Sequence, residues 1–292
     1  MCIRDSLTSG LSNTVVGSTA GDALTTGGYN VFMGQTAGGG TTGSSYGVMV
    51  GYGAGNANIT AAGNGSVGIG ALALNALTSG EGNVAVGYNS LLACTTGGDN
   101  TIVGYEAGYT LNGSNNTALG HSALSASVDG NNNTAIGYKA LLTYEGGSTE
   151  GNNVAVGSVA GMSVSTGQYN TIIGAFAGDG IQTAAGCVAI GYMALSGVAT
   201  FDNTVAIGFA AGESLTSGEY NVLIGAEAAK DMTIADRNTA VGYKALYTLN
   251  AGQDCSRNTG VGNLAGTLIS TGYDNTVIGS DAGKQISWGI NK

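Results

Sequence analysis

Apolar and polar positions alternate in a short phrase that recurs along almost the whole chain. The phrase reads Asn-(Thr/Val)-x-(Ile/Val)-Gly-x-x-Ala, and an aliphatic residue or Met precedes its glycine in all sixteen copies. Eleven of the fifteen intervals between these glycines are 17 residues, one is 16, one is 19 and two are 20. A fixed period of this kind predicts a solenoid in which each repeat forms one coil. The sixteen glycines, here called the glycine column, are Gly17, Gly34, Gly51, Gly70, Gly87, Gly104, Gly120, Gly137, Gly157, Gly174, Gly191, Gly208, Gly225, Gly242, Gly262 and Gly279.

The unit that begins at Asn133 shows how the phrase predicts a coil. Thr134 and Ile136 are two residues apart and therefore share one face of a strand, which Gly137 ends. Ala140 is expected in a second short extended segment or at a corner, and the Gly-, Ser-, Thr- and Asn-rich remainder predicts turns. We therefore expect two short strands and two turns per coil, with successive coils paired in parallel and like residues stacked over like.

The predicted strand is apolar on both of its faces. The residue between the two flanking positions is never polar or charged, whereas a half-exposed strand should alternate. We assign the flanking positions to the coil interior, with core residues Val16, Ile69, Val86, Val103, Ile136, Val156, Ile173, Ile190, Ile207, Ile224, Val241 and Ile278. The central position then needs a partner, and self-association about a long axis is the natural solution. The candidate trimer-interface residues are Phe32, Met49, Ile102, Ile172, Leu223 and Val277.

Asparagine starts the phrase in twelve of the sixteen units. Stacked asparagines can form a ladder in which each side chain bonds to those above and below. A turn asparagine with left-handed φ explains the same pattern equally well. The alanine three residues after the glycine, replaced once by Ser90, indicates a tight corner or a subunit contact.

Composition agrees with an ordered, extended chain of 292 residues. The 54 glycines come with no proline and 43% hydrophobic residues, so they read as turn residues rather than as disorder. Charged residues make up 9% of the chain and the net charge is −10. The absence of a basic stripe argues against nucleic acid, and no apolar run is long enough to insert into a membrane. The acidity is typical of a soluble surface.

The repeat region is expected to be one domain of residues 13–283. Residues 1–12 form a leader whose start, Met1–Ser6, resembles a cloning or gene-prediction remnant, and residues 284–292 form a short tail. Solenoids usually carry atypical repeats as caps at their ends. Because such caps are nearly absent from this sequence, we expect a segment of a longer fibre. Cys94 and Cys187 lie more than five coils apart, beyond disulfide reach, and are expected to be free buried thiols.

Catalytic and metal chemistry finds little support, and we expect no enzyme activity, cofactor or metal. The only histidine, His121, occupies the position after the column glycine where tyrosine stands in other coils, which favours a surface variant over a base. This tyrosine column is a candidate surface for stacking on sugars, or else packs at a strand edge. Its tyrosines are Tyr52, Tyr88, Tyr105, Tyr138, Tyr192 and Tyr243. Insertions near 56–62, 144–151 and 250–257 are candidate contact loops.

The phrase resembles the head repeat of the YadA-like trimeric autotransporter adhesins. The nearest matches to that family's Ser-Val-Ala-Ile-Gly motif are residues 187–191, 204–208 and 83–87, and the resemblance covers roughly residues 13–283. It implies a left-handed parallel β-roll of about sixteen coils that forms a homotrimer on a bacterial cell surface. The coils here are longer than many repeats of the family.

The resemblance implies a non-enzymatic adhesive rod, the head of a surface adhesin. Such a rod would bind an extracellular glycan or protein surface by multivalent display. A bacteriophage tail fibre, as a shaft or receptor-binding segment of the virion, is an alternative with the same mechanical logic. A second alternative is an ice-binding β-solenoid, because threonine occupies one flanking column in eight units. The interchange of that threonine with valine fits an interior position better, and no regular Thr-x-Thr pair occurs.

Overall fold

The computed structural model describes residues 8–145, 151–197, 200, 202–249 and 255–286, which form two compact units divided after Glu150. The first unit contains β1 (Thr14–Val16), β2 (Val31–Met33), β3 (Val48–Val50), a short 3-10 helix η1 (Ala61–Gly63), β4 (Val67–Ile69), β5 (Val84–Val86), β6 (Thr101–Val103), β7 (Thr117–Leu119) and β8 (Thr134–Ile136). The second contains β9 (Val154–Val156), β10 (Thr171–Ile173), β11 (Val188–Ile190), β12 (Val205–Ile207), β13 (Val222–Ile224), β14 (Thr239–Val241), β15 (Thr259–Val261) and β16 (Thr276–Ile278).

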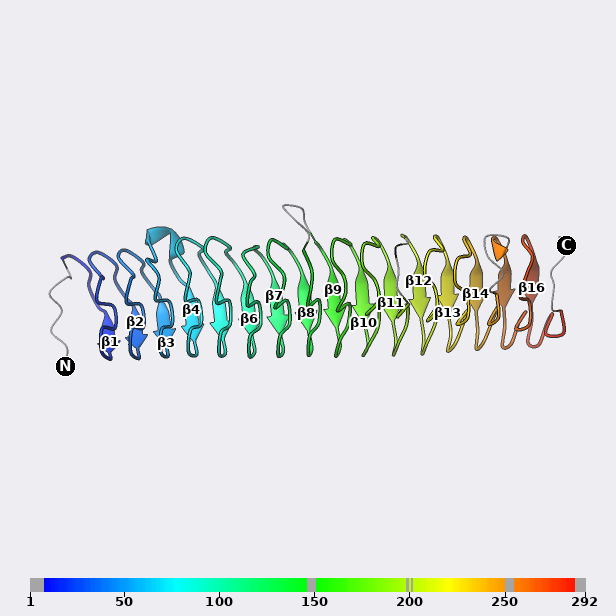
Figure 1. Cartoon of the computed structure of the whole chain (residues 1–292), viewed down its shortest axis with the longest axis horizontal. Coiled ribbons are helices and arrows are strands. Elements are labelled where there is room, and N and C mark those ends of the chain that lie inside the picture. Colours follow the sequence, from blue (N-terminus) through cyan, green and yellow to red (C-terminus); the bar gives the residue numbers. More distant parts are fainter. Residues whose placement is uncertain (1–7, 146–150, 198–199, 201, 250–254, 287–292) are drawn as a thin grey trace. The chain divides into compact units, whose positions relative to one another are not determined.

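Within each unit the strands follow one another in chain order, and each pairs in parallel with the next (Figure 1). Pairing is in register with like residues over like, as where Thr101 of β6 pairs with Val84 of β5 and Thr117 of β7. The prediction of an all-β parallel solenoid with one repeat per coil is confirmed.

The second strand predicted for each coil is absent from the described residues. The segment after the column glycine is instead a run of turns, with residues of left-handed φ such as Lys139 (54°) and Leu141 (47°). Its backbone still bonds to the neighbouring coils: Leu124 N–H donates to the Ala140 carbonyl at 3.1 Å. The backbone turns back at alternate residues with left-handed φ. The segment is therefore too short to adopt the extended backbone of a strand.

The two strand faces lie the opposite way round from the sequence prediction. The central residues predicted for a trimer interface lie inside the coil: Phe32, Met49, Ile102, Ile172 and Leu223 are at most 1% exposed, and Val277 is half-buried. The flanking residues predicted for the core point outward. Val16, Ile69, Ile173, Ile224 and Ile278 are exposed, and Val86, Val103, Ile136, Val156, Ile190, Ile207 and Val241 are half-buried.

The buried asparagine decides which face points inward. Asn100 precedes β6 and is fully buried, and side chains alternate along a strand, so Ile102 also points inward while Thr101 and Val103 point outward. The predicted strand faces are wrong because neither a turn nor a ladder role for the asparagine fixes the side of the strand on which it lies.

The coil interior is filled by residues of complementary volume. Leucines that follow the alanine position, which is Ser90 in one coil, are fully buried; Leu91 and Leu124 accompany a small central residue, Ala85 or Ala118. Where the central residue is large, the leucine is replaced by glycine, or by Ala229 in the coil of Leu223. A Cβ on Gly38 would lie 2.7 Å from the Phe32 ring, and one on Gly55 would lie 2.6 Å from Met49 Sδ. Their irregular alternation is therefore core packing.

The glycine column is required by both conformation and space. Gly104 has φ +147°, and a Cβ there would overlap the carbonyl oxygen of Gly120 in the next coil. The same collision with the following column glycine recurs along both units, for example from Gly208 onto Gly225. Only a residue without a side chain allows the coils to stack so closely.

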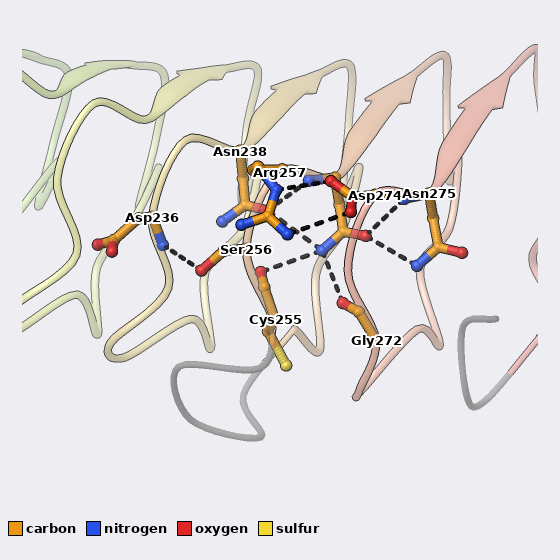
Figure 2. A network of polar contacts seen from close by, with 9 residues as sticks. Asp236, Asn238, Cys255, Ser256, Arg257, Gly272, Asp274 and Asn275 are labelled. Carbon is orange, nitrogen blue, oxygen red and sulfur yellow. Dashed lines mark hydrogen bonds and ion pairs between the residues drawn. The ribbon is translucent and has the colours of Figure 1, made fainter. Parts of the chain in front are cut away.

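The asparagines form a ladder, which settles the two readings of that column. Asn100 Nδ2 donates to Asn83 Oδ1 at 3.0 Å and to the Gly113 carbonyl at 2.8 Å. Its Oδ1 accepts from the backbone N–H (2.9 Å) and Nδ2 (3.1 Å) of Asn116. Figure 2 shows the same arrangement between Asn238 and Asn275. These amides are buried with their hydrogen bonds made, so they stabilise the stack rather than cost energy.

Cys94 and Cys187 are buried thiols without a disulfide, as expected, and Cys255 is a third buried thiol. Burial raises the pKa of the Cys94 and Cys187 thiols from 9.0 to about 11, despite hydrogen bonds to backbone groups that act in the opposite direction. Both thiols therefore stay protonated and unreactive near neutral pH. Cys2 and Trp288 lie outside the described residues.

Candidate functional site

The outward strand positions make an apolar face on each unit. We define the outer face as the first and third residues of the strands: the first is always Thr or Val and the third always aliphatic or Met. Seven of the third-position side chains are 37–69% exposed, and these are Val16, Met33, Ile69, Leu119, Ile173, Ile224 and Ile278. No charged side chain interrupts either column, so each outer face offers a continuous apolar surface to a partner.

The tyrosine column begins where the strands end, one residue beyond the glycine column. In four consecutive coils of the first unit, Tyr88, Tyr105, His121 and Tyr138 form a ladder of rings, here called the aromatic ladder. Their centroids are 5.2, 5.0 and 5.5 Å apart, with interplanar angles of 20°, 18° and 49°. The three tyrosines are 45–47% exposed. The structure thus brings together three of the six tyrosines predicted for a contact surface.

The other three predicted tyrosines are separate from the ladder. Tyr192, in the second unit, stacks on Phe209 with centroids 5.6 Å apart and meets Phe176 edge to face at 5.9 Å. Tyr52 and Tyr243 are exposed, but the same position of the adjacent coils holds no aromatic residue. The rings of the ladder pack on each other and still expose part of their surface, and stacking on sugars stays a prediction.

His121 takes the place of a tyrosine in the ladder, as its position in the repeat predicted. Its ring lies against Tyr105, and its Nδ1 is 2.9 Å from the hydroxyl of Ser122. The neighbouring position of the ladder coils carries Glu106, Ser122 and Lys139, and the Lys139 ammonium lies 5.2 Å from the Tyr138 ring centroid. The ladder therefore has polar groups of both charges along one side.

A second group of exposed tyrosines was missed by the sequence reasoning. Tyr29 and Tyr46 stack with centroids 5.3 Å apart and planes 3° apart, and Tyr169 and Tyr220 occupy the same repeat position. All four directly precede an asparagine-column position, in the left-handed region. Their constant position, one residue before the asparagine column, is the signal in the sequence that could have predicted them.

Charged side chains pair between neighbouring coils in the second unit. Lys230 lies 3.2 Å from Glu213 and Lys244 lies 3.5 Å from Glu227, in each case from the same repeat position one coil apart. Arg257 and Asp274 make a two-pronged pair at 2.6 and 3.1 Å (Figure 2). The hydrogen bonds from Arg257 lower the pKa of the Asp274 carboxyl. These solvent-facing pairs fix neighbouring side chains and contribute little stability.

The remaining candidates from the sequence give no built site. Within the described ranges, no three His, Cys, Asp or Glu side chains are grouped to hold a metal ion, and no helix is long and apolar enough to cross a membrane. Of the insertions, the first holds η1, whereas residues 146–150 and 250–254 lie outside the described part. No protein-family model, curated protein or solved structure matches the chain.

Proposed function

We propose that the chain is a non-enzymatic adhesive module whose copies associate through their outer faces into a left-handed homotrimeric β-roll. The observation that carries this proposal is the outer face itself: an uninterrupted column of aliphatic residues and Met beside an uncharged column of Val and Thr, which a single chain leaves partly exposed. Isolated soluble proteins rarely expose apolar surface of such continuity, and a closed cyclic assembly buries it without leaving an open end.

The face that we assign to association differs from the one expected at first. The central column is filled by the chain's own core, so the flanking columns now serve as the contact surface. The trimeric state, the handedness and the bacterial cell surface come from the resemblance to YadA-like heads. Display of identical contacts on three chains would convert weak binding to an extracellular glycan or protein into avidity.

Light scattering on a size-exclusion column tests the association. We expect a mass near three times 28.5 kDa. Val103→Asp introduces a charge into the outer face of β6 and should shift the mass toward the monomer, whereas Thr96→Asp, at an exposed turn, should not. A wild-type monomer at micromolar concentration would refute the proposal.

Ice binding is a second candidate, favoured by one correction. The threonine column, taken for interior from the sequence, points outward, and Thr101 and Thr117 are exposed on neighbouring strands. A flat array of methyl and hydroxyl groups at strand spacing, ~4.8 Å, is a surface that can order water. Because both candidates use the outer face, a trimer argues against ice. A monomer that inhibits ice recrystallisation, and loses this on Thr117→Lys, would establish it.

A further inference from the structure

We propose that the aromatic ladder binds an uncharged, linear β-1,4-linked hexopyranose polymer, with one sugar resting on each coil. The inference rests on the proposed function only in that the ladder must stay outside the contact between copies. The ladder lies beyond the glycine column, past the ends of the strands that form the outer face.

Three rings of the ladder, those of Tyr88, Tyr105 and His121, stack nearly parallel, and the Tyr138 ring is tilted by 49° to His121. Atoms of stacked rings touch at about 3.5–4.0 Å, whereas the centroids of Tyr88, Tyr105 and His121 are 5.2 and 5.0 Å apart. Nearly parallel rings that touch at that centroid separation are offset along their planes, the arrangement that stacked aromatic pairs prefer. Each ring therefore covers only part of its neighbour, and the tyrosines keep 45–47% of their surface exposed. The ladder offers one open area of aromatic surface per coil.

The spacing of these open areas selects the shape of the ligand. Coils repeat at about the parallel strand spacing, ~4.8 Å, and a β-1,4-linked hexopyranose chain advances by close to that length per sugar. Such a chain is extended and its sugars are flat, with C–H groups on their faces that pack on aromatic carbon. An α-linked glucan coils and cannot keep successive sugars in line with the rings.

The charges beside the ladder select an uncharged ligand. Glu106 and Lys139 have opposite sign and lie at the same repeat position two coils apart, so neither an acidic nor a basic polymer is favoured along the whole ladder. The Glu106 carboxylate and the Lys139 ammonium supply an acceptor and donors suited to sugar hydroxyls, whereas Ser122 between them is buried against His121. Nucleic acid also stacks on aromatic rings, but the net charge of −10 repels its phosphates.

Binding by several weak, linked contacts should depend on ligand length. Calorimetry with β-1,4-linked glucose oligomers from dimer to hexamer should show affinity rising with each sugar and levelling off at about four, one for each ring. Full-length protein should co-sediment with cellulose and with chitin, and not with insoluble amylose. Tyr88→Ala/Tyr105→Ala/Tyr138→Ala should weaken cellulose binding at least about tenfold.

Matched variants separate the ladder from tyrosine content and from folding. Tyr29→Ala/Tyr46→Ala removes a more exposed stacked pair elsewhere and should leave binding unchanged. Tyr105→Leu keeps apolar bulk but removes the central ring, so it should weaken binding even where the triple variant unfolds. His121→Tyr completes the ladder and should strengthen binding.

Two results would overturn the proposal: no binding of the wild-type protein to any β-1,4-linked polymer, or unchanged binding by Tyr105→Leu. Different results would refute the proposed function. A monomer that binds cellulose through the ladder refutes trimeric assembly alone, whereas a trimer that ignores these polymers refutes the ladder assignment alone.

Discussion

Volume at single positions determines which residues can occupy the coil interior. Phe32 fits because Gly38 across the coil has no side chain, and Leu91 fits because Ala85 is small. The backbone does not impose this choice, since Leu91 adopts φ 50° and Gly38 adopts φ 60°, nearly the same conformation. In these two coils the residue at this position matches the size of its core partner, whereas Ala155 with Gly161 and Ala206 with Gly212 combine two small residues.

Exchanging the two sizes should rescue a damaged core. Phe32→Ala should lower the free energy of unfolding by about 3–5 kcal/mol through the cavity that it leaves, and Gly38→Leu should cost about 1–3 kcal/mol or more through overpacking. The double variant copies the Ala85/Leu91 pair and should recover to within about 2 kcal/mol of wild type. Urea denaturation measures each value. Additive losses would contradict complementary packing.

The buried thiols should make stability fall at high pH. A thiol protonated more strongly in the folded state than in the unfolded state stabilises the fold below pH 9, and this contribution is lost as the pH rises from about 9 to 11. Each thiol should contribute about 2–3 kcal/mol over that range. Comparing the wild type with Cys94→Ala/Cys187→Ala isolates this loss from tyrosine titration. Parallel stability curves would exclude it.

At the scale of the element, a three-residue strand has one inward and two outward side chains, and its neighbours hold it in place. Strand β6 illustrates this, with Ile102 fully buried between two outward residues. The asparagine ladder continues the same alternation inward, so the side chains before and within the strand enter the coil together.

Two adjacent substitutions in β6 should have opposite consequences. Ile102→Asp places a carboxylate in the apolar interior and should cost at least about 4 kcal/mol or prevent folding. Val103→Asp changes an outward side chain and should cost about 1 kcal/mol or less, while reducing association. Thermal unfolding followed by circular dichroism distinguishes them. Equal destabilisation would mean that the strand faces are wrongly assigned.

Replacing a ladder asparagine should show how much the side-chain hydrogen bonds contribute. Asn100→Ala strips partners from buried groups of Asn83, Gly113 and Asn116 and should cost about 2–4 kcal/mol. Asn100→Thr should cost less, because Thr204 fills this column natively and bonds to Asn221 N–H and the Gly218 carbonyl. A smaller cost for alanine than for threonine would contradict the role given to the ladder.

The sequence was sufficient for the period, the strand positions and the parallel stacking, because each depends on which residue types recur and where. It did not give the orientation of the strand. Val and Ile are equally suited to a core and to an outer face, so hydropathy could not place Val103 or Ile136. The buried asparagine settles the orientation, because it lies two residues before the central residue and so shares its face. Using this signal requires knowing that the asparagine amide makes its hydrogen bonds inside the coil.

The candidate site was predictable in part for a related reason. A column of tyrosines is visible in the sequence, but ring contact needs adjacent coils, so the unbroken run from Tyr88 to Tyr138 differs from isolated Tyr52 and Tyr243. The second strand was predicted wrongly because left-handed φ at residues such as Leu141 is rare for leucine, and no sequence signal announced it.

At the scale of the whole molecule, each coil contacts chiefly the coils beside it, so stability should be a sum of local terms. Removing residues 88–104, one 17-residue repeat, joins Gly87 to Tyr105 and keeps the phrase intact. The shortened protein should fold with a cooperative melt and a slightly lower melting temperature. Removing nine residues within the same repeat should abolish folding of the unit. Equal tolerance of both deletions would contradict a coil-by-coil architecture.

The mixed sizes in the core also bear on how the chain finds its fold. Sixteen nearly identical phrases offer many wrong pairings in which a coil skips its neighbour and stacks on the next one. The core opposes such slippage, because a Cβ on Gly68 would meet Met49 of the preceding coil at 3.0 Å and one on Gly260 would meet Leu246 at 2.7 Å. Each of these large side chains therefore packs into space that only one particular neighbouring coil leaves open. A chain with the same alanine and leucine in every coil would keep its fold and lose these markers, and would refold into a mixture of trapped, misaligned stacks.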